Sequence, residues 1–218
     1  MSHRSHPKIL KIKGIKDWLS RGFYKDNFPK LLEEDFKIRK FLAKRLPEGA
    51  VESIEIERSP SVLKILIKTA RPALVIGRGG KGVENLQKGL IKIIPKGKLD
   101  NESKKDVKIE IIEVRNPWTS ASLISQWVAG QLEKRVPYRR VLKMALSRTM
   151  EQKEIKGAKI QVSGRLNGIE ISRTEWLKEG NLPRGTFRSN LEYGFSEAKC
   201  TYGVLGVKVW LYKGEKFD

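Results

Sequence analysis

Hydrophobic and polar positions alternate with the period of an α-helix early in the chain. Residues 31–46 repeat apolar side chains at helical spacing with charged ones between them, and the Pro-Glu-Gly stretch at 47–49 ends the pattern. The sequence therefore predicts an amphipathic helix. Its apolar side is expected to consist of Leu31, Leu32, Phe36, Ile38 and Leu42.

After this helix, apolar and polar residues alternate with a period of two, as in β-strands. Residues 51–56 and 62–67 alternate apolar and polar side chains around a Ser-Pro-Ser turn, which predicts a β-hairpin. Pro72 suits the first turn of a short helix that runs to Ile76. The predicted order is helix, strand, strand, helix, glycine loop, helix and strand. The last helix and the last strand are expected at 83–91 and 107–114.

The second half of the chain reads as two helices followed by strands. Helices are predicted at 120–134 and 137–153, and strands at 158–164, 169–176, 186–201 and 204–212. The Asn-Gly pair at 167–168 favours a hairpin turn. Pro117 disfavours helix at Asn116, so the domain boundary is expected at these two residues. We expect an α+β protein of two domains, with two helices packed on a small, mainly antiparallel sheet in the second. The expected division is a basic arm at 1–16, domains at 17–115 and 116–213, and a short tail at 214–218.

The amino-acid composition indicates the class of molecule that the protein binds. The 218 residues carry a formal net charge of +20, which attracts polyanions such as nucleic acid or an anionic membrane. No apolar run approaches a membrane span, and the lone Cys200 permits no internal disulfide. Both histidines, His3 and His6, lie in the arm, so a Ser-His or Cys-His catalytic pair has little to draw on and no metal site is expected. A soluble, polyanion-binding protein without cofactor fits best.

The glycine cluster at 76–83 can be interpreted in several ways. Gly77, Gly79 and Gly82 match the dinucleotide fingerprint G-x-G-x-x-G, but neither the preceding strand nor an acidic residue at a later strand end is in place. A Walker-type phosphate loop fails because Gly82 follows Lys81 where Ser or Thr is needed. The alternative is a structural glycine turn whose charged residues have no binding role.

The remaining interpretation is the G-x-x-G loop of a KH module, which clamps the backbone of single-stranded nucleic acid. Gly77 and Gly80 would leave room for phosphates at main-chain N–H groups, and the next helix would point its positive end at them. The element order indicates the second KH topology. Val75, Ile76 and Val83 are expected to pin the two helices to the sheet. The predicted RNA-binding loop is Gly77, Arg78, Gly79, Gly80 and Lys81.

The helix predicted from residue 137 separates its residue types. Tyr138, Val141, Leu142 and Ala145 share one face, while Arg139, Arg140 and Lys143 lie opposite, where they could track phosphates or simply be solvated. Other basic candidates for contact with nucleic acid are Lys134, Arg135, Arg148, Arg165, Arg173, Lys11 and Lys13.

Other polar and aromatic residues allow two interpretations each. The arm could order on a partner or fray. Glu170 and Glu175 are expected to pair with Arg165, Arg173 and Lys178 rather than to act in acid–base chemistry. The aromatic set could stack bases, although strand spacing favours core packing; it comprises Trp176, Trp210, Tyr193, Tyr202 and Tyr212. Cys200 is expected to be a small buried hydrophobe rather than a nucleophile.

Several longer segments together resemble one known family. These are GAKIQVSGRLNG at 157–168, RTEW at 173–176, TYGVLGVKVW at 201–210 and VIGRGG at 75–80. On these segments the chain resembles small-subunit ribosomal protein three in its bacterial form, over nearly its whole length.

The resemblance implies an N-terminal type II KH domain and a structural, non-enzymatic role in the head of the small ribosomal subunit. Implied partners are 16S ribosomal RNA, messenger RNA and small-subunit ribosomal proteins ten and fourteen, in a cytoplasmic, ribosome-bound protein that is not a homo-oligomer. The family's basic triplet at the messenger RNA entry channel, which grips and helps unwind message, falls on Arg139, Arg140 and Lys143. The alternative hypothesis is a KH-containing RNA-processing or ribosome-assembly factor.

Overall fold

The computed structural model divides into two compact units, and each is described by itself. It describes residues 18–22, 28–47, 49–59, 62–93, 106–183 and 185–215. One unit spans Asp17–Arg115, and the other includes Asn116–Asp218. Within the described ranges, no helix is both long and apolar enough to cross a membrane.

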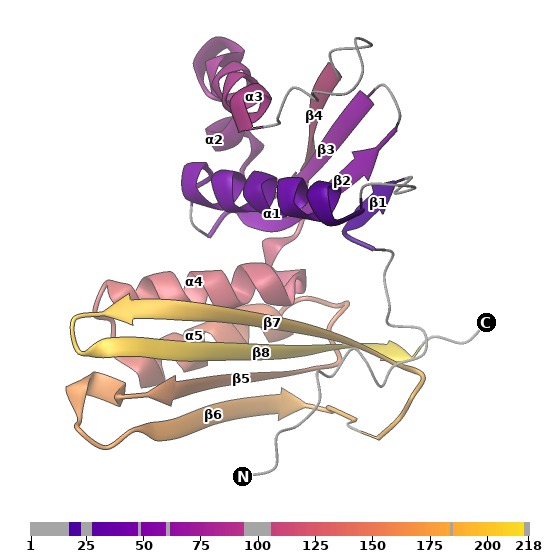
Figure 1. Ribbon diagram of the computed structural model, residues 1–218. Helices are drawn as coiled ribbons and strands as arrows, with labels where there is room; N and C mark the ends of the chain where they lie inside the picture. Colours follow the sequence, from indigo (N-terminus) through magenta and orange to yellow (C-terminus); the bar gives the residue numbers. More distant parts are fainter. Residues whose placement is uncertain are drawn as a thin grey trace. The chain divides into compact units, whose positions relative to one another are not determined.

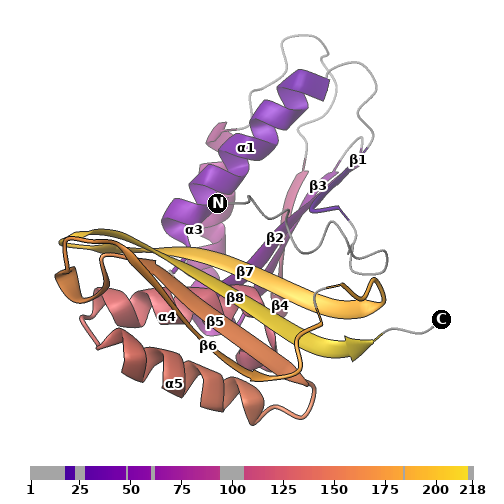
Figure 2. The same cartoon turned by 90° about the horizontal axis from the view of Figure 1, so that it is seen from below.

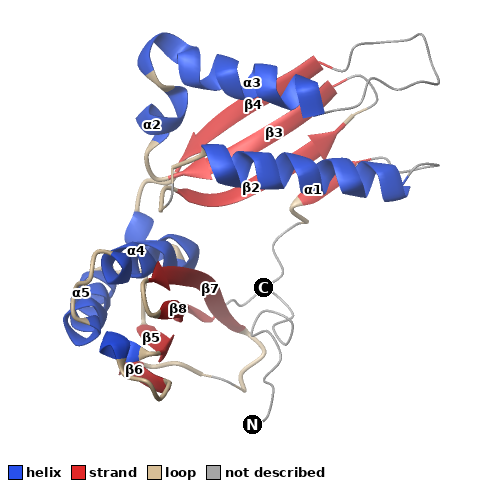
Figure 3. Cartoon of the chain, turned by 60° about the vertical axis from the view of Figure 1, so that its left-hand side comes forward, coloured by secondary structure: helices blue, strands red, loops and turns tan. Residues whose placement is uncertain are grey.

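The first unit is a four-stranded sheet with helices on one face (Figures 1 and 3). Strand order is β1-β2-β3-β4; β2 and β3 form the antiparallel hairpin, and the outer pairs β1/β2 and β3/β4 are parallel. This confirms the predicted α+β KH order, to which the structure adds the short strand β1. The elements are β1 Ser20–Gly22, α1 Phe28–Arg45, β2 Val51–Arg58, β3 Val62–Thr69, α2 Pro72–Ile76, α3 Lys81–Ile93 and β4 Asp106–Glu113.

Apolar side chains from all three helices meet the inner face of this sheet. Ile38 and Leu42 of α1 and Leu90 of α3 are fully buried there, and Ile65 and Ile67 of β3 lie beneath them. Burial of this apolar area is the main force that holds the helices on the strands. The sheet and helices therefore form one rigid support for the α2–α3 connection.

The apolar side predicted for α1 was partly wrong. Leu32 and Phe36 are exposed, whereas Asp35 is buried. Arg58 of β2 explains this, because its Nε lies 2.8 Å from Asp35 Oδ1 and its Nη1 lies 2.9 Å from Glu34 Oε2. A buried guanidinium must be paired, so the helix turns its acids inward.

The second unit packs two helices against a fully antiparallel sheet of order β6-β5-β8-β7. Figure 2 shows α4 and α5 on the same side of the four strands. The predicted two-helix and sheet architecture is confirmed. The elements are α4 Ala121–Glu133, α5 Tyr138–Met150, β5 Gly157–Gly164, β6 Arg173–Gly180, β7 Ser189–Cys200 and β8 Gly203–Glu215.

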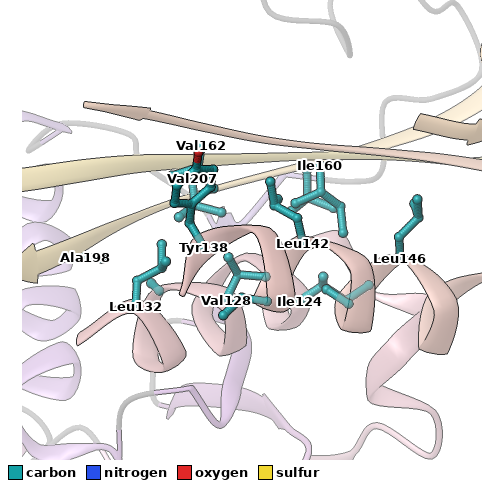
Figure 4. Packing of buried hydrophobic residues seen from close by; sticks show 14 of the residues in the cluster. Ile124, Val128, Leu132, Tyr138, Leu142, Leu146, Ile160, Val162, Ala198 and Val207 are labelled. Atoms are coloured by element: carbon teal, nitrogen blue, oxygen red, sulfur yellow. The ribbon is translucent and has the colours of Figure 1, made fainter. Parts of the chain in front are cut away.

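The core of this unit lies between the helices and the strands (Figure 4). Val128 of α4 and Leu142 of α5 meet Ile160 and Val162 of β5, and all four are at most 1 % exposed. The strand predicted at 169–176 was displaced, since β6 begins at Arg173 and the preceding residues form a longer connection than the Asn-Gly pair suggested.

Candidate nucleic-acid interface

The glycine cluster forms a tight connection between α2 and α3. The backbone leaves α2 at Gly77, passes through one 3₁₀ turn at Arg78–Gly80 and enters α3 at Lys81. Gly77 N–H donates to the carbonyl of Ala73 at 3.0 Å, and Lys81 N–H donates to that of Arg78. The loop is therefore held by its own main chain.

Two different constraints select glycine in this connection. Gly79 and Gly80 have φ of 60° and 77°, values that residues with a Cβ rarely adopt, although a Cβ at either would meet no atom within 4 Å. Within the protein, backbone conformation rather than space therefore favours glycine at Gly79 and Gly80. Space is limiting at Gly82, where a Cβ would lie 2.5 Å from the carbonyl oxygen of Val75, and at Gly77, where it would lie 3.0 Å from Gly82 N.

The loop exposes both charge and backbone. Arg78 and Lys81 are exposed, and they stand at the start of α3, whose first N–H groups have no acceptor within the helix. Of the expected anchors, Val75 is 3 % exposed and packs in the core. Ile76 is 39 % exposed and does not pin its helix to the sheet, because α2 ends there and the chain turns outward.

Helix α5 presents the predicted division of faces. Tyr138, Val141, Leu142 and Ala145 are buried against the core, which fixes the rotation of the helix about its axis. The cations Arg139, Arg140 and Lys143 are exposed on the opposite side. They line an open groove of about 720 Å³ between α5 and β6, which is hereafter the α5 groove.

Glu175 of β6 engages one of these three cations. Its Oε1 accepts the Tyr138 hydroxyl at 2.7 Å, and Arg139 Nε lies 3.5 Å from its Oε2. The Tyr138 hydrogen bond, followed by Arg139, lowers the pKa of the Glu175 carboxyl. Of the expected partners, Arg173 acts on Glu175 only through its charge, which also lowers the pKa of the carboxyl, while the ion pair of Glu175 is with Arg139. Within the described residues, Arg140 and Lys143 have no ion-pair partner.

The remaining candidate contacts lie at separate places. Arg148 packs over the rings of Trp118 and Trp127, with its Cζ 5.3 Å and 5.6 Å from their centroids. Arg173 is exposed at the start of β6. Arg165 donates to three carbonyl oxygens rather than to a carboxylate. The candidates Lys11 and Lys13 lie outside the described residues, and Lys134 and Arg135 directly follow α4.

The aromatic residues divide between the two interpretations. Tyr212 is 5 % exposed and packs in a small core, whereas Trp176 is 53 % exposed. Lys159 Nζ lies 4.5 Å from the Trp176 centroid and 5.4 Å from that of Trp210, so a buried lysine is held by cation–π contacts. Cys200 is half-buried, and its Sγ lies 3.8 Å from the carbonyl oxygen of Leu132.

Comparison with known proteins identifies both units. The model of "Ribosomal protein S3, C-terminal domain" matches residues 128–211, and that of "KH domain" matches residues 37–119. Small ribosomal subunit protein uS3 of Desulfitobacterium hafniense is 46% identical over 99% of this chain and 94% of its own length. The chain belongs to the ribosomal protein S3 family.

Further S3 relatives have similar coverage. The uS3 protein of Clostridium novyi is 45% identical over 99% of this chain and 94% of its own length. That of Endomicrobium trichonymphae is 43% identical over 100% of this chain and 90% of its own length. The S3 family is one of ribosomal proteins of the small subunit, not of enzymes, and the predicted resemblance is confirmed.

Sequence reasoning missed two features of this S3 chain. It gave Gly82 no structural part in the KH loop, and it did not place Glu175 against α5. The first could have been suspected from the third glycine of the cluster. The second depends on strand register and on a tyrosine 37 residues away, which no local pattern contains.

Proposed function

We propose that this protein is a structural constituent of the small-subunit head that binds 16S ribosomal RNA and lines the messenger RNA entry channel. The observation that carries the proposal is the exposed cation face of α5, whose orientation is fixed by the buried face behind it. Side chains that are already positioned can hold phosphates with little further loss of conformational freedom.

At the α5 groove, the proposed role is to hold message in place without any chemical reaction. Arg139, Arg140 and Lys143 hold the phosphates of message while translocation pulls the strand, so paired segments open without nucleotide hydrolysis by this chain. Arg140 and Lys143 are available for phosphate, whereas Arg139 must share its charge with Glu175. The three cations are therefore not equivalent in this proposal.

The α2–α3 loop is proposed as a second RNA contact. Main-chain N–H groups at the start of α3 and the exposed Arg78 and Lys81 together suit a phosphate backbone. Arg148, Arg165 and Arg173 remain proposed ribosomal RNA contacts. Ribosomal proteins ten and fourteen are proposed neighbours, and the proposed location is the cytoplasmic ribosome; the family resemblance supports both.

Sedimentation of particles in high salt tests the main proposal against a transient assembly or processing factor. A resident constituent, with many contacts, stays with the small subunit after a high-salt wash, whereas a transient visitor with few contacts is released as salt weakens them. Recovery of the washed protein in the soluble fraction would contradict the proposal. Crosslinking of the retained protein to 16S ribosomal RNA and to message checks its contacts.

The loop is tested separately by the double substitution Gly77→Asp and Gly80→Asp. Two carboxylates beside Arg78 and Lys81 repel phosphates, so affinity for a single-stranded oligonucleotide is expected to fall by about tenfold or more. The control is Gly49→Asp, which also adds a carboxylate at a positive-φ glycine of the same unit. Equal affinities of the loop variant and the control would refute the role of the loop.

A further inference from the structure

A second groove lies at one end of the C-terminal unit, and three chain connections build it. It measures about 420 Å³ and is lined by Arg135 and Val136 after α4, Asn167 between β5 and β6, and Thr201 and Tyr202 between β7 and β8. The groove is shallow and open to solvent. It shares no lining residue with the α5 groove.

Arg135 occupies a position where helices normally place glycine. Helix α4 ends in a Schellman motif, in which Val136 N–H donates to the carbonyl of Gln131 at 3.2 Å and Arg135 N–H to that of Leu132 at 2.9 Å. Arg135 therefore adopts φ of 61°, a left-handed conformation that disfavours any residue with a Cβ. Glycine would complete this motif with less strain.

Asn167 shares this unusual backbone. Its φ is 55°, and within the described part of the chain it and Arg135 are the only non-glycine residues with positive φ. Both line this one groove. Asparagine adopts this conformation readily in turns, so the strain that calls for an explanation lies at Arg135, and such strained residues cluster at binding sites more than elsewhere.

The wall between the connections is braced by Arg165. Its guanidinium donates to the carbonyl oxygens of Ile169 at 3.2 Å, Tyr202 at 3.3 Å and Gly168 at 3.4 Å, which ties the β5–β6 connection to the β7–β8 turn. Gly168 places no side chain against the Tyr202 ring, since a Cβ there would lie 3.8 Å from Tyr202 Cδ1. The groove is therefore preformed and has an aromatic wall.

The charge around the groove suits phosphate. Lys134 and Arg135 are both exposed at the end of α4. The neighbouring acid, Glu133, already accepts the backbone N–H of Lys199 at 2.8 Å through its Oε1. Two cations beside an aromatic ring are the elements with which proteins hold single-stranded nucleic acid.

We propose that this groove takes one unpaired nucleobase of an RNA strand against the Tyr202 ring, while Arg135 and Lys134 hold the adjoining phosphates. The inference rests on the proposed function, since it assigns a specific site to the RNA that the family is proposed to bind. It makes Arg135 and Tyr202 partners in one site rather than separate surface contacts.

Arg135→Gly is the decisive substitution, because it relieves the backbone and removes only the proposed contact. The thermal midpoint of the full chain is expected to stay unchanged or rise, while the dissociation constant for a fluorescein-labelled oligouridine of about twelve nucleotides rises. The slope of log affinity against log salt should become shallower by about 0.7, the value for one lost single-strand phosphate contact. Lys153→Ala, which removes one exposed charge of the same unit outside the groove, is the control.

The nucleobase is tested through Tyr202. Tyr202→Phe keeps the ring and should bind as the parent does, whereas Tyr202→Leu keeps apolar bulk and should weaken binding about fivefold or more. An oligonucleotide with abasic sites should remove this difference between the two variants. A melting curve on each variant shows that the fold persists, and photo-crosslinking of 4-thiouridine RNA to the peptide that contains Tyr202 gives an independent readout on the parent chain.

The outcomes separate the site from the general function. If the parent chain binds RNA and Arg135→Gly binds it with the same affinity and the same salt slope, the proposed RNA site in the groove is refuted. The proposed function would still stand. Absence of RNA binding by the parent chain would overturn both. If Arg135→Gly weakened binding of a polyglutamate peptide and not of RNA, the groove would hold an acidic protein segment, and the proposal would be wrong.

Discussion

Simultaneous replacement of Arg139, Arg140 and Lys143 by alanine tests the proposed grip on message. Each phosphate contact to a single strand contributes about 0.7 to the slope of log affinity against log salt, so three contacts contribute about 2.1. Because Glu175 shares the charge of Arg139, the loss is expected between about 1.4 and about 2.1. Between about 50 and about 200 mM salt, a loss of 2.1 makes the parent's affinity fall about 18-fold more than the variant's.

Fluorescence anisotropy with a labelled single-stranded RNA at several salt concentrations measures this slope. The matched control replaces Lys153, Lys178 and Lys199, three exposed lysines of the same unit, and removes an equal charge away from the α5 groove. The two variants have the same net charge, so a difference in slope between them reports the location of the contacts. Equal slopes would refute the argument that α5 holds phosphates in place.

The same triple variant, assembled into ribosomes, tests the entry channel. Translation through a stable hairpin in the message should slow more than translation through an unstructured message, because the opened strand is no longer held. Equal slowing on both messages would show that the basic face of α5 acts elsewhere, even if its contribution to RNA affinity stood.

Three further substitutions test the framework around these sites. Gly82→Ala places a Cβ within 2.5 Å of a backbone carbonyl and should destabilise the KH unit by about 1–3 kcal/mol in denaturant unfolding, whereas Gly130→Ala, in open space on α4, should be neutral or stabilising. Tyr138→Phe removes the hydrogen bond that most lowers the pKa of Glu175, so that pKa should rise toward the ordinary glutamate value in a carboxyl NMR titration; an unchanged pKa would contradict the assigned cause. Asp35→Asn removes one of the two carboxylates that pair with the buried Arg58, while Glu34 remains, and should cost about 1–3 kcal/mol; a loss below about 1 kcal/mol would show that the Asp35 pair is dispensable.

Features that depend on one element were predictable from the sequence. The two faces of α5 follow from spacing alone, because burial of one face fixes the exposure of the other. The KH element order followed from the change between the helical period and the two-residue period of strands, and from prolines and glycines at helix ends. The α2 bounds were obtained for that reason.

Features that join distant segments were not predictable in this way. Asp35 turns inward because of an arginine 23 residues away, and helical spacing alone assigned Phe36 to the core instead. The connection before β6 contains Ile169, whose carbonyl oxygen accepts a hydrogen bond from the Arg165 side chain, and no local pattern shows this contact. The distinction between Gly80 and Gly82 needs coordinates, because one is selected by its φ and the other by a neighbouring carbonyl.

The α2–α3 connection has a consequence for mutational mapping. Its shape depends on main-chain hydrogen bonds and on the close approach of Gly82 to a carbonyl group, and the donors it offers to a ligand at the start of α3 belong to the backbone. Alanine scanning leaves backbone donors in place, so a scan of Arg78 and Lys81 would underestimate this surface. Amide-to-ester substitution in a semisynthetic chain would remove the donors one at a time and reveal the part of the affinity that side chains do not carry.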